Sequence, residues 1–175
     1  MRMPVWRGMT AADLPAVDRI AAIVHPGYPE RPAVMAERLR LFPEGCLVAA
    51  VPGEDTLVGY AIAHPARPGV PPALDSLLKG LSGRESVLHL HDIALLPEAR
   101  RGGLGGRGVR RLVAVAEAAG LAGLTLIAVA DAAPYWVRLG FRDAAPAEAG
   151  EKALASYGGA SRYMAAPTAV VAAAL

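Results

Sequence analysis

The chain has 175 residues, 54% of them hydrophobic and 19% charged, so it can bury one substantial core and does not have the composition of a disordered protein. Its formal net charge of +2 is too small for a dedicated nucleic-acid binder. Cys46 is the only cysteine, which excludes an intramolecular disulfide and a cysteine-based zinc site.

The two ends of the chain carry no sign of export or of a membrane span. Residues 1–6 lack the apolar core of a signal peptide, and the longest apolar stretch, 169–175, is too short to cross a bilayer. We therefore expect a single domain over residues 1–175, located in the cytoplasm, without a nucleic-acid or membrane partner.

The secondary structure follows from apolar periodicity and from the positions of proline and glycine. Thr10 is a plausible N-cap for the first helix, and the proline-rich stretches 25–32 and 65–72 predict loops. Apolar runs bounded by turn residues predict strands at 4–9, 46–51, 56–63, 87–96 and 124–130, with two more between 141 and 167. Helical spacing predicts helices at 11–24, 33–41, 74–78, 104–119 and 134–139. This irregular alternation, with hairpins and crossovers, predicts an α+β fold with a mixed sheet.

The most informative segment is 87–106, where an apolar strand with two histidines meets a turn rich in arginine and glycine. Unpaired N–H groups at a helix N-terminus, together with the helix dipole, favour phosphate oxygens. The segment therefore predicts a phosphate cradle beside titratable imidazoles. Five arginines nearby suit either an electrostatic funnel for a small polyanion or a solvated helix face: Arg100, Arg101, Arg107, Arg110 and Arg111.

The same turn can be compared with two other phosphate-binding motifs, the dinucleotide fingerprint and the Walker-type loop. Gly103-Leu-Gly-Gly-Arg-Gly108, with Asp131 at the end of the next strand, matches the dinucleotide fingerprint of a Rossmann unit. However, six residues separate the preceding strand from Gly103, that strand is polar on one side, and the chain after Asp131 is too short for a doubly wound sheet. A Walker-type loop is excluded because no Gly-Lys-Ser/Thr follows.

The segment Arg100-Arg-Gly-Gly-Leu-Gly105, preceded by Leu95-Leu-Pro97, resembles the acetyl-CoA pyrophosphate loop of the GNAT superfamily of N-acetyltransferases. A strand, a short helix and Leu139-Gly-Phe141 follow in the family's order, and the resemblance extends from about residue 5 to 165. It implies an α+β domain with a mostly antiparallel central sheet flanked by helices, acetyl-CoA as co-substrate and no metal. His89-Leu-His91 is similar to the His-x-His strand of the arylalkylamine (serotonin-type) branch.

The resemblance also implies roles for individual residues. Backbone groups of Ile93, Ala94 and Leu95 would bind the pantetheine arm and polarise the thioester carbonyl, while amides of the glycine turn would hold the pyrophosphate. The expected cofactor-binding residues are Ile93, Ala94, Leu95, Arg100, Arg101, Gly102, Gly103, Leu104, Gly105, Gly106 and Trp136.

An amine acceptor must lose a proton before it attacks, and imidazole titrates near neutral pH. His89 and His91 are two residues apart, so both project from one face of a strand, and the resemblance implies that they accept this proton directly or through water. The residues alone leave open two structural histidines, or a metal pair for which no third ligand is evident. Asp92 is expected on the opposite face unless a local bulge reverses it. His25 and His64, each before a proline in a loop, are expected to be structural.

The general acid departs from the family pattern. Many relatives have a tyrosine five residues before the phenylalanine of the Gly-Phe pair, where this chain has Trp136. An indole N–H donates a hydrogen bond but does not deliver a proton at neutral pH. A thiol with a pKa near ~8.5 leaves tolerably unaided, so we expect activity with a weak or absent acid. Tyr135, about 100° around the helix, is the candidate substitute, with core packing as its alternative.

The leading hypothesis is direct transfer of an acetyl group from acetyl-CoA to a primary amine, either a small arylalkylamine or a polyamine-like acceptor. The alternatives are a protein or peptide N-acetyltransferase and a non-catalytic acyl-CoA-binding module. Oligomeric state is open, with a homodimer as one option. Loops 25–32 and 65–73 are expected to wall the acceptor cleft, whose candidate contacts are Tyr28, Glu30, Glu37, Phe42, Asp75 and Trp136.

Overall fold

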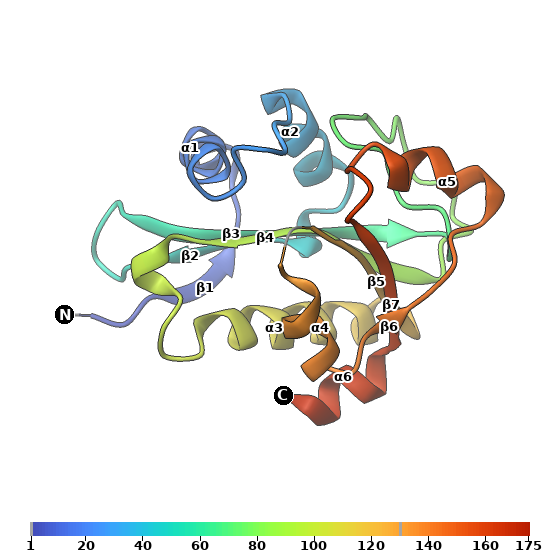
Figure 1. Cartoon of the computed structure of the whole chain (residues 1–175). Coiled ribbons are helices and arrows are strands. Elements are labelled where there is room, and N and C mark those ends of the chain that lie inside the picture. Colours follow the sequence, from blue (N-terminus) through green and yellow to red (C-terminus); the bar gives the residue numbers. More distant parts are fainter. Residues whose placement is uncertain (1, 130) are drawn as a thin grey trace.

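The structure is a computed structural model that describes residues 2–129 and 131–175. Its sheet is built from β1 (Val5–Gly8), β2 (Cys46–Ala50), β3 (Leu57–Ala66), β4 (Val87–Leu95), β5 (Gly123–Ala128), β6 (Arg142–Asp143) and β7 (Arg162–Pro167). These seven strands form one sheet in the order β1-β2-β3-β4-β5-β7-β6 (Figure 1). Within the described residues the β4–β5 pair is parallel and every other pair is antiparallel. The expected α+β fold with a mixed, mostly antiparallel sheet is confirmed.

Helices cover both faces of this sheet. They are α1 (Leu14–Val24), α2 (Pro32–Leu41), α3 (Leu104–Ala118), α4 (Ala133–Arg138), α5 (Glu148–Ala155) and α6 (Thr168–Ala174). Figure 1 shows α1, α2 and α5 on one face and α3, α4 and α6 on the other. None of the helices in the described part of the chain is long and apolar enough to cross a membrane.

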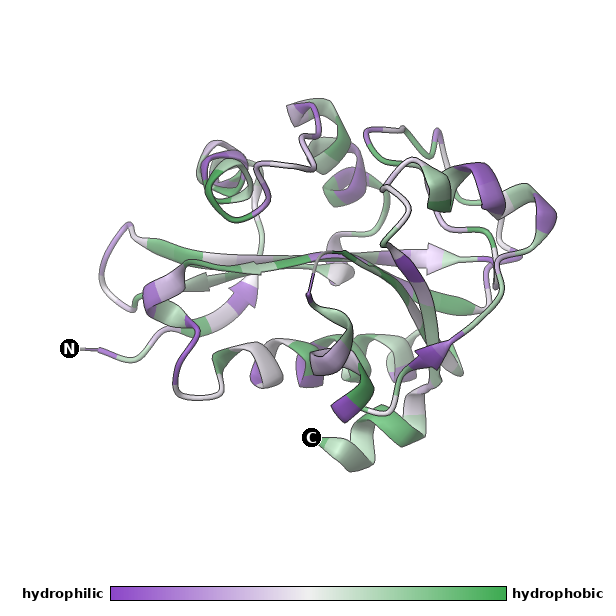
Figure 2. Ribbon diagram, viewed as in Figure 1, coloured by the Kyte–Doolittle hydropathy of each residue, from purple (hydrophilic) through white to green (hydrophobic). Residues whose placement is uncertain are grey.

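Two apolar clusters lie on opposite faces of the sheet. The larger one joins the sheet to α3 and includes Leu88 and Leu90 of β4 together with Leu112. The smaller one lies beneath α1 and α2 and includes Val17 and Tyr60. Figure 2 shows the apolar residues of the central strands running between the two helical layers. The sheet therefore presents a different set of β4 side chains to each layer.

Helix α3 begins and ends where its sequence indicates. Gly102 and Gly103 precede it with φ values of +82° and +72°, a left-handed conformation that suits glycine, and Gly120 follows it with φ +69°. On α3 itself, Gly108 admits the indole of Trp6 so closely that a Cβ there would lie 2.6 Å from Trp6 Cζ2. The Trp6 Nε1–H donates to the Leu104 carbonyl at 2.8 Å, which fixes β1 to the first turn of α3.

The sequence-based assignments need three corrections. The helix predicted at 74–78 is a loop, because Glu37 accepts hydrogen bonds from the amides of Leu78 and Lys79 and holds the loop open. His64 lies in β3 rather than in a loop, since the strand continues through Pro65. Helices α5 and α6 were not predicted. The strand predicted at 124–130 is β5, and Ala130 itself lies outside the described residues.

Candidate active site

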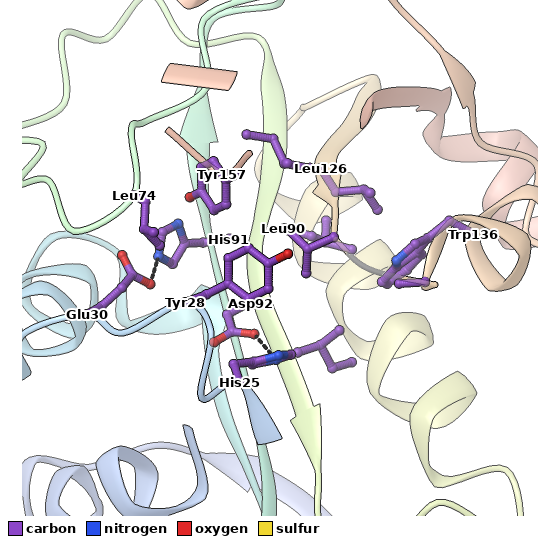
Figure 3. A pocket seen from close by; sticks show the side chains of 14 residues that line it. His25, Tyr28, Glu30, Leu74, Leu90, His91, Asp92, Leu126, Trp136 and Tyr157 are labelled. Atoms are coloured by element: carbon purple, nitrogen blue, oxygen red, sulfur yellow. Dashed lines mark hydrogen bonds and ion pairs between the residues drawn. The ribbon is translucent and has the colours of Figure 1, made fainter. Parts of the chain in front are cut away.

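The site lies where two parallel strands separate. β4 pairs with β5 only from Val87 opposite Gly123 to Leu90 opposite Leu126, after which β4 continues to Leu95 without this neighbour. Backbone groups on that side of residues 91–95 therefore lack a β5 partner. A cavity of about 90 Å³ occupies the opening, and Leu90, Leu126 and Trp136 line it (Figure 3). The fold thus presents unpaired main-chain groups along one wall of a cleft.

A bulge in β4 brings two consecutive side chains to this cleft. Ala63 of β3 lies opposite Leu90 and Ile62 lies opposite Asp92, so His91 is an extra residue without a partner on β3. Such an insertion interrupts the alternation of a strand. Both His91 and Asp92 line the cleft as a result. Asp92 therefore does not face the opposite side from His91, as simple alternation predicted, because the bulge is the exception that reverses it.

His91 is held by a carboxylate from the loop after α1. Its Nε2 lies 2.8 Å from Oε1 of Glu30, and its side chain is only 1% exposed. Because the carboxylate can only accept, Nε2 carries the proton and Nδ1 is bare. The other Glu30 oxygen accepts the amide of Asp75 at 3.1 Å. Glu30 therefore fixes the tautomer of His91 and ties the loop at 75 to the cleft.

Asp92 forms a second pair with the same loop, this time with the histidine on the loop side. Nε2 of His25 lies 2.9 Å from Oδ1 of Asp92 (Figure 3), and the Tyr60 hydroxyl donates to Oδ2. Burial alone would raise the pKa of Asp92, but His25 and Tyr60 hold it below 3.8. Burial lowers the pKa of His25, and the opposing Asp92 carboxylate outweighs it, so this pKa is raised above 6.5. His25, expected to be structural, lies in the cleft.

The structure separates His89 from His91. Although both project from the same face of β4, His89 is 1% exposed and does not line the cleft. Its Nδ1 lies 3.0 Å from the hydroxyl of Thr125, and its ring centroid is 5.4 Å from that of His64. Burial, and then the neighbouring imidazoles, lower the pKa of His89 well below 6.5. His89 is therefore a neutral core residue behind the cleft wall.

The glycine turn follows the C-terminal end of β4 and leads into α3. Gly103 is the N-cap of α3 and has no side chain that could cap the helix, so the first amides, from Leu104 on, have neither an intrahelical acceptor nor a side-chain cap. A Cβ at Gly105 would lie 3.5 Å from the Tyr135 hydroxyl and 3.7 Å from Leu95 Cδ1. Gly105 thus lies beside Tyr135 and the last residue of β4, and the amides of the turn that have no intrahelical acceptor suit a bound anion.

The arginines near the turn divide into two groups. Arg100 donates to the Leu95 carbonyl at 3.2 Å and Arg107 to the Gly102 carbonyl at 2.7 Å, so both lie against the turn. Arg110 donates to the last carbonyl of the chain, and Arg111 donates to Trp6 at 3.2 Å. Arg101 is exposed beside the turn. The positive charge closest to the turn therefore comes from Arg100 and Arg101 at its start and from Arg107 in α3.

Helix α4 presents two aromatic residues with different surroundings. Trp136 is 6% exposed, lines the cleft, and packs edge-on against Phe141 with ring centroids 5.4 Å apart. Tyr135 packs against Trp136, and its hydroxyl lies beside Gly105 at the glycine turn. Burial raises the pKa of Tyr135, so its hydroxyl stays protonated at neutral pH.

The acceptor side of the cleft is lined by residues distant in sequence. Tyr28 and Tyr157 face one another with ring centroids 6.4 Å apart, and both line the cavity with Glu30 (Figure 3). Tyr157, at the end of α5, was not predicted, and no local signal marks it. Of the other candidates, Glu37 is buried against Arg38, Asp75 pairs with Arg31, and Phe42 packs on the larger core, so none of these three lines the cleft.

Comparison with known proteins agrees with the observed fold. The sequence model of the acetyltransferase (GNAT) family matches residues 14–141. A search of curated protein sequences found no match. In the described residues no group of three or more histidine, cysteine, aspartate or glutamate side chains is placed to hold a metal ion.

Solved structures share the fold at low sequence identity. The ribosomal-protein-S18-alanine N-acetyltransferase from Escherichia coli has a TM-score of 0.64 at 22% identity, covering 95% of this chain and 94% of its own. The GNAT-like decarboxylase GphF with isobutyryl-CoA has a TM-score of 0.73 at 16% identity, covering 94% and 99%. Naa50 of Arabidopsis thaliana, with a bisubstrate analogue containing CoA, has a TM-score of 0.68 at 10% identity, covering 93% and 97%.

Proposed function

Because this chain belongs to the acetyltransferase (GNAT) family, we propose that it transfers an acetyl group from acetyl-CoA to the primary amine of a small cationic acceptor. One observation carries the proposal: the cleft between β4 and β5 has a helix N-terminus near one end and two histidine–carboxylate pairs at the other. The first end suits a diphosphate, and the second suits an ammonium group and its proton.

The cofactor half of the proposal uses main-chain groups. Amides from Gly102 to Gly106 would hold the diphosphate, with Arg100 and Arg107 beside the turn. The side of β4 that faces away from β3 has backbone groups without a strand partner near Ile93 and Leu95. Arg100 occupies the Leu95 carbonyl, and the other groups would bind the amide-bearing arm that leads to the thioester. Trp136 lines the cleft beyond them and would pack against the acetyl group.

Charge favours a singly charged acceptor. His25, whose pKa is raised, offsets the charge of Asp92, and this leaves Glu30 as the uncompensated carboxylate of the cleft. Tyr28 and Tyr157 offer aromatic faces to the same cation. The two tyrosines and Glu30 therefore favour a short amine, including an arylalkylamine whose ring stacks on Tyr28 and Tyr157.

We assign the base to His91 and its orientation to Glu30. The carboxylate holds the Nε2–H and leaves Nδ1 as the basic atom, as the carboxylate of a Ser-His-Asp triad does for its histidine. Because Nδ1 is itself buried, the amine proton would reach it through water. The free amine then attacks the thioester carbonyl and the C–S bond breaks. The second proton, which the nitrogen loses as it becomes an amide, passes through water to the leaving thiolate, without a dedicated acid because the usual tyrosine is Trp136.

The test compares two histidines two residues apart. His91→Ala should lower kcat about 100-fold or more while the Kd for CoA stays within about twofold. His89→Ala, the matched control, should lower thermal stability but leave kcat of the folded protein within about threefold, because His89 does not reach the cleft. Thiol release from acetyl-CoA, measured with short primary amines and with N-terminal peptides, identifies the acceptor. Faster turnover of the peptides, or equal losses in both variants, would contradict this assignment.

A further inference from the structure

A second cavity lies between the end of β3 and the loop that leads to β4. It measures about 260 Å³, and the last residues of β3 and the loop at 67–85 line it. Within the part of the chain that the structure describes, this lining has no residue in common with that of the cleft. An apolar protein cavity of about 150 Å³ holds a benzene ring, so this one has room for a small organic molecule.

The loop over this cavity is fixed by two buried residues of α2. Glu37 accepts hydrogen bonds from the amides of Leu78 and Lys79 at 2.6 and 2.9 Å. Arg38 donates to the Ser76 carbonyl at 3.0 Å and is itself paired with Glu37. Groups of the protein therefore hold the loop in place over β3. The cavity is preformed, as sites for small molecules usually are.

One buried atom of the lining has no partner among the described residues. His64, near the end of β3, lines the cavity and is 1% exposed. Its Nδ1 lies 2.9 Å from the Pro65 carbonyl, which can only accept, so Nδ1 carries the proton and Nε2 is bare. Nε2 is the buried atom that lacks a partner. Because burial lowers the pKa of His64 to about 3, the ring stays neutral and Nε2 can only accept a hydrogen bond.

The rest of the lining is mostly apolar and its charges cancel. Val70 and Leu81 line the cavity from the loop. Leu77 also lines it and is 41% exposed, so a ligand there would remove apolar surface from water. Arg67 is the one cation and Glu85 the one anion among the described lining residues. An uncharged molecule with an apolar body and one hydrogen-bond donor therefore matches this cavity.

We propose that this cavity binds a small uncharged alcohol with an apolar body, represented by a simple phenol, whose hydroxyl donates to Nε2 of His64. A phenol is neutral at pH 7, because its pKa lies near ~10. Its ring would pack against Val70 and Leu81, and its hydroxyl would satisfy the buried nitrogen. The site is additional to the acetyl transfer, since its lining is separate from the cleft. Failure of either proposal leaves the other standing.

The first experiment compares a probe that has a hydroxyl with one that does not. Calorimetric titration of the full chain should show 4-methylphenol binding about fivefold or more tightly than 4-methylanisole, because only the phenol can donate to Nε2 of His64. His64→Leu should reduce this ratio to less than about twofold. Equal affinity of the wild-type protein for the two probes, or a single ordered water on Nε2 in crystals soaked with 4-methylphenol, would overturn the proposal.

The second experiment uses matched variants to locate the probe. Val70→Phe fills the cavity and should weaken the binding of both probes about tenfold or more, whereas Tyr28→Ala, in the cleft, should leave both affinities within about twofold. The opposite pattern would place the probes in the cleft and overturn the proposal. If a variant does not fold, long-range proton–nitrogen spectra of the wild-type protein decide. The Nε2 signal of His64 should shift with 4-methylphenol and not with 4-methylanisole, and an unshifted signal rules the site out.

Discussion

The imidazole of His25 and the carboxylate of Asp92 form an ion pair with a distance of 2.9 Å between Nε2 and Oδ1. A second pair, Glu30 with His91, connects the same two segments with the histidine and the carboxylate exchanged. The loop after α1 is thus fixed to the bulge of β4 at two points, and both points line the cleft. The loop on the acceptor side of the cleft and the strand that would bind the thioester are therefore held together by these two pairs.

The first pair should make stability depend on pH. The pKa of His25 is raised above 6.5, so its contribution is fully present below that pH and is lost as the pH rises through the folded-state pKa. The pKa of Asp92 is lowered below 3.8, so its contribution is present above 3.8 and is lost as the pH falls through the folded-state pKa. Urea unfolding should therefore show His25→Gln destabilised by about 1–2 kcal/mol between pH ~4 and ~6.5, narrowing toward pH ~8.

The control for this titration is an exposed pair elsewhere. Arg162 and Asp143 are 2.7 Å apart at the far edge of the sheet, and both are largely solvent-exposed. Asp143→Asn should change the free energy of unfolding by less than about 1 kcal/mol across the same pH range. If the loss of unfolding free energy in His25→Gln stays constant up to pH ~8, the lost ion pair is not its cause.

CoA affinity should depend on which face of the glycine turn is filled. Valine at Gly105 would direct its side chain toward Tyr135 and Leu95, between the first turn of α3 and the end of β4. Valine at Gly106 keeps the backbone amide but directs its side chain elsewhere. Its Cβ would lie 3.8 Å from Cδ2 of Leu175. Calorimetric titration of CoA should show at least tenfold weaker binding for Gly105→Val and less than about threefold for Gly106→Val. Equal affinities would place the diphosphate elsewhere.

The contact between β1 and α3 should be sensitive to a single methyl group. A Cβ at Gly108 would lie 2.6 Å from the buried indole of Trp6, whose Nε1–H is already bonded to Leu104. Gly108→Ala should cost about 1–3 kcal/mol despite the better helix propensity of alanine. Gly8→Ala, on the β1 edge, meets nothing within 4 Å and serves as the control. Thermal unfolding of both variants measures the difference; a Gly108→Ala variant as stable as wild type would show that Trp6 can move aside.

Tyr135 and Trp136 should affect different steps. The Tyr135 hydroxyl lies at the glycine turn, so Tyr135→Phe should change the Kd for CoA by a few-fold and kcat by less than about threefold. Trp136→Phe keeps an aromatic ring in the cleft wall and should mainly change the KM for the amine. Steady-state kinetics with both substrates varied separates these effects. A fall in kcat of about 100-fold in Tyr135→Phe would instead identify it as the acid for the leaving thiolate.

The sequence predicted well those elements whose ends are set by neighbouring residues. Helix α3 was expected at 104–119 and spans Leu104–Ala118, because glycines with positive φ bound a run with helical spacing. The loop at 74–78 was misassigned because Glu37, forty residues earlier on α2, satisfies its amides. β3 continues past His64, and Pro65 lies opposite Leu88 in the β3–β4 ladder. The prediction failed here because it assumed that proline ends a strand.

The candidate site was less accessible to sequence reasoning. Alternation along β4 places His89 and His91 on one face, but only the structure shows that His91 lines the cleft and His89 does not. The bulge that turns Asp92 toward the cleft depends on pairing with β3, and a single strand does not reveal it. The partners of the two site pairs, His25 and Glu30, come from a loop distant in sequence, so their proximity follows from the tertiary fold alone.

The early separation of β4 from β5 leaves peptide groups, rather than side chains, to meet a ligand. Every amino acid except proline supplies the same amide, so this part of the surface tolerates substitution while the backbone path is kept. The loops at 25–31 and 67–85, by contrast, face the other end of the opening with side chains. Grafting foreign sequences into these two loops, with His25 and Glu30 retained, should therefore alter the amine preference while the part of the chain that would hold CoA is unchanged.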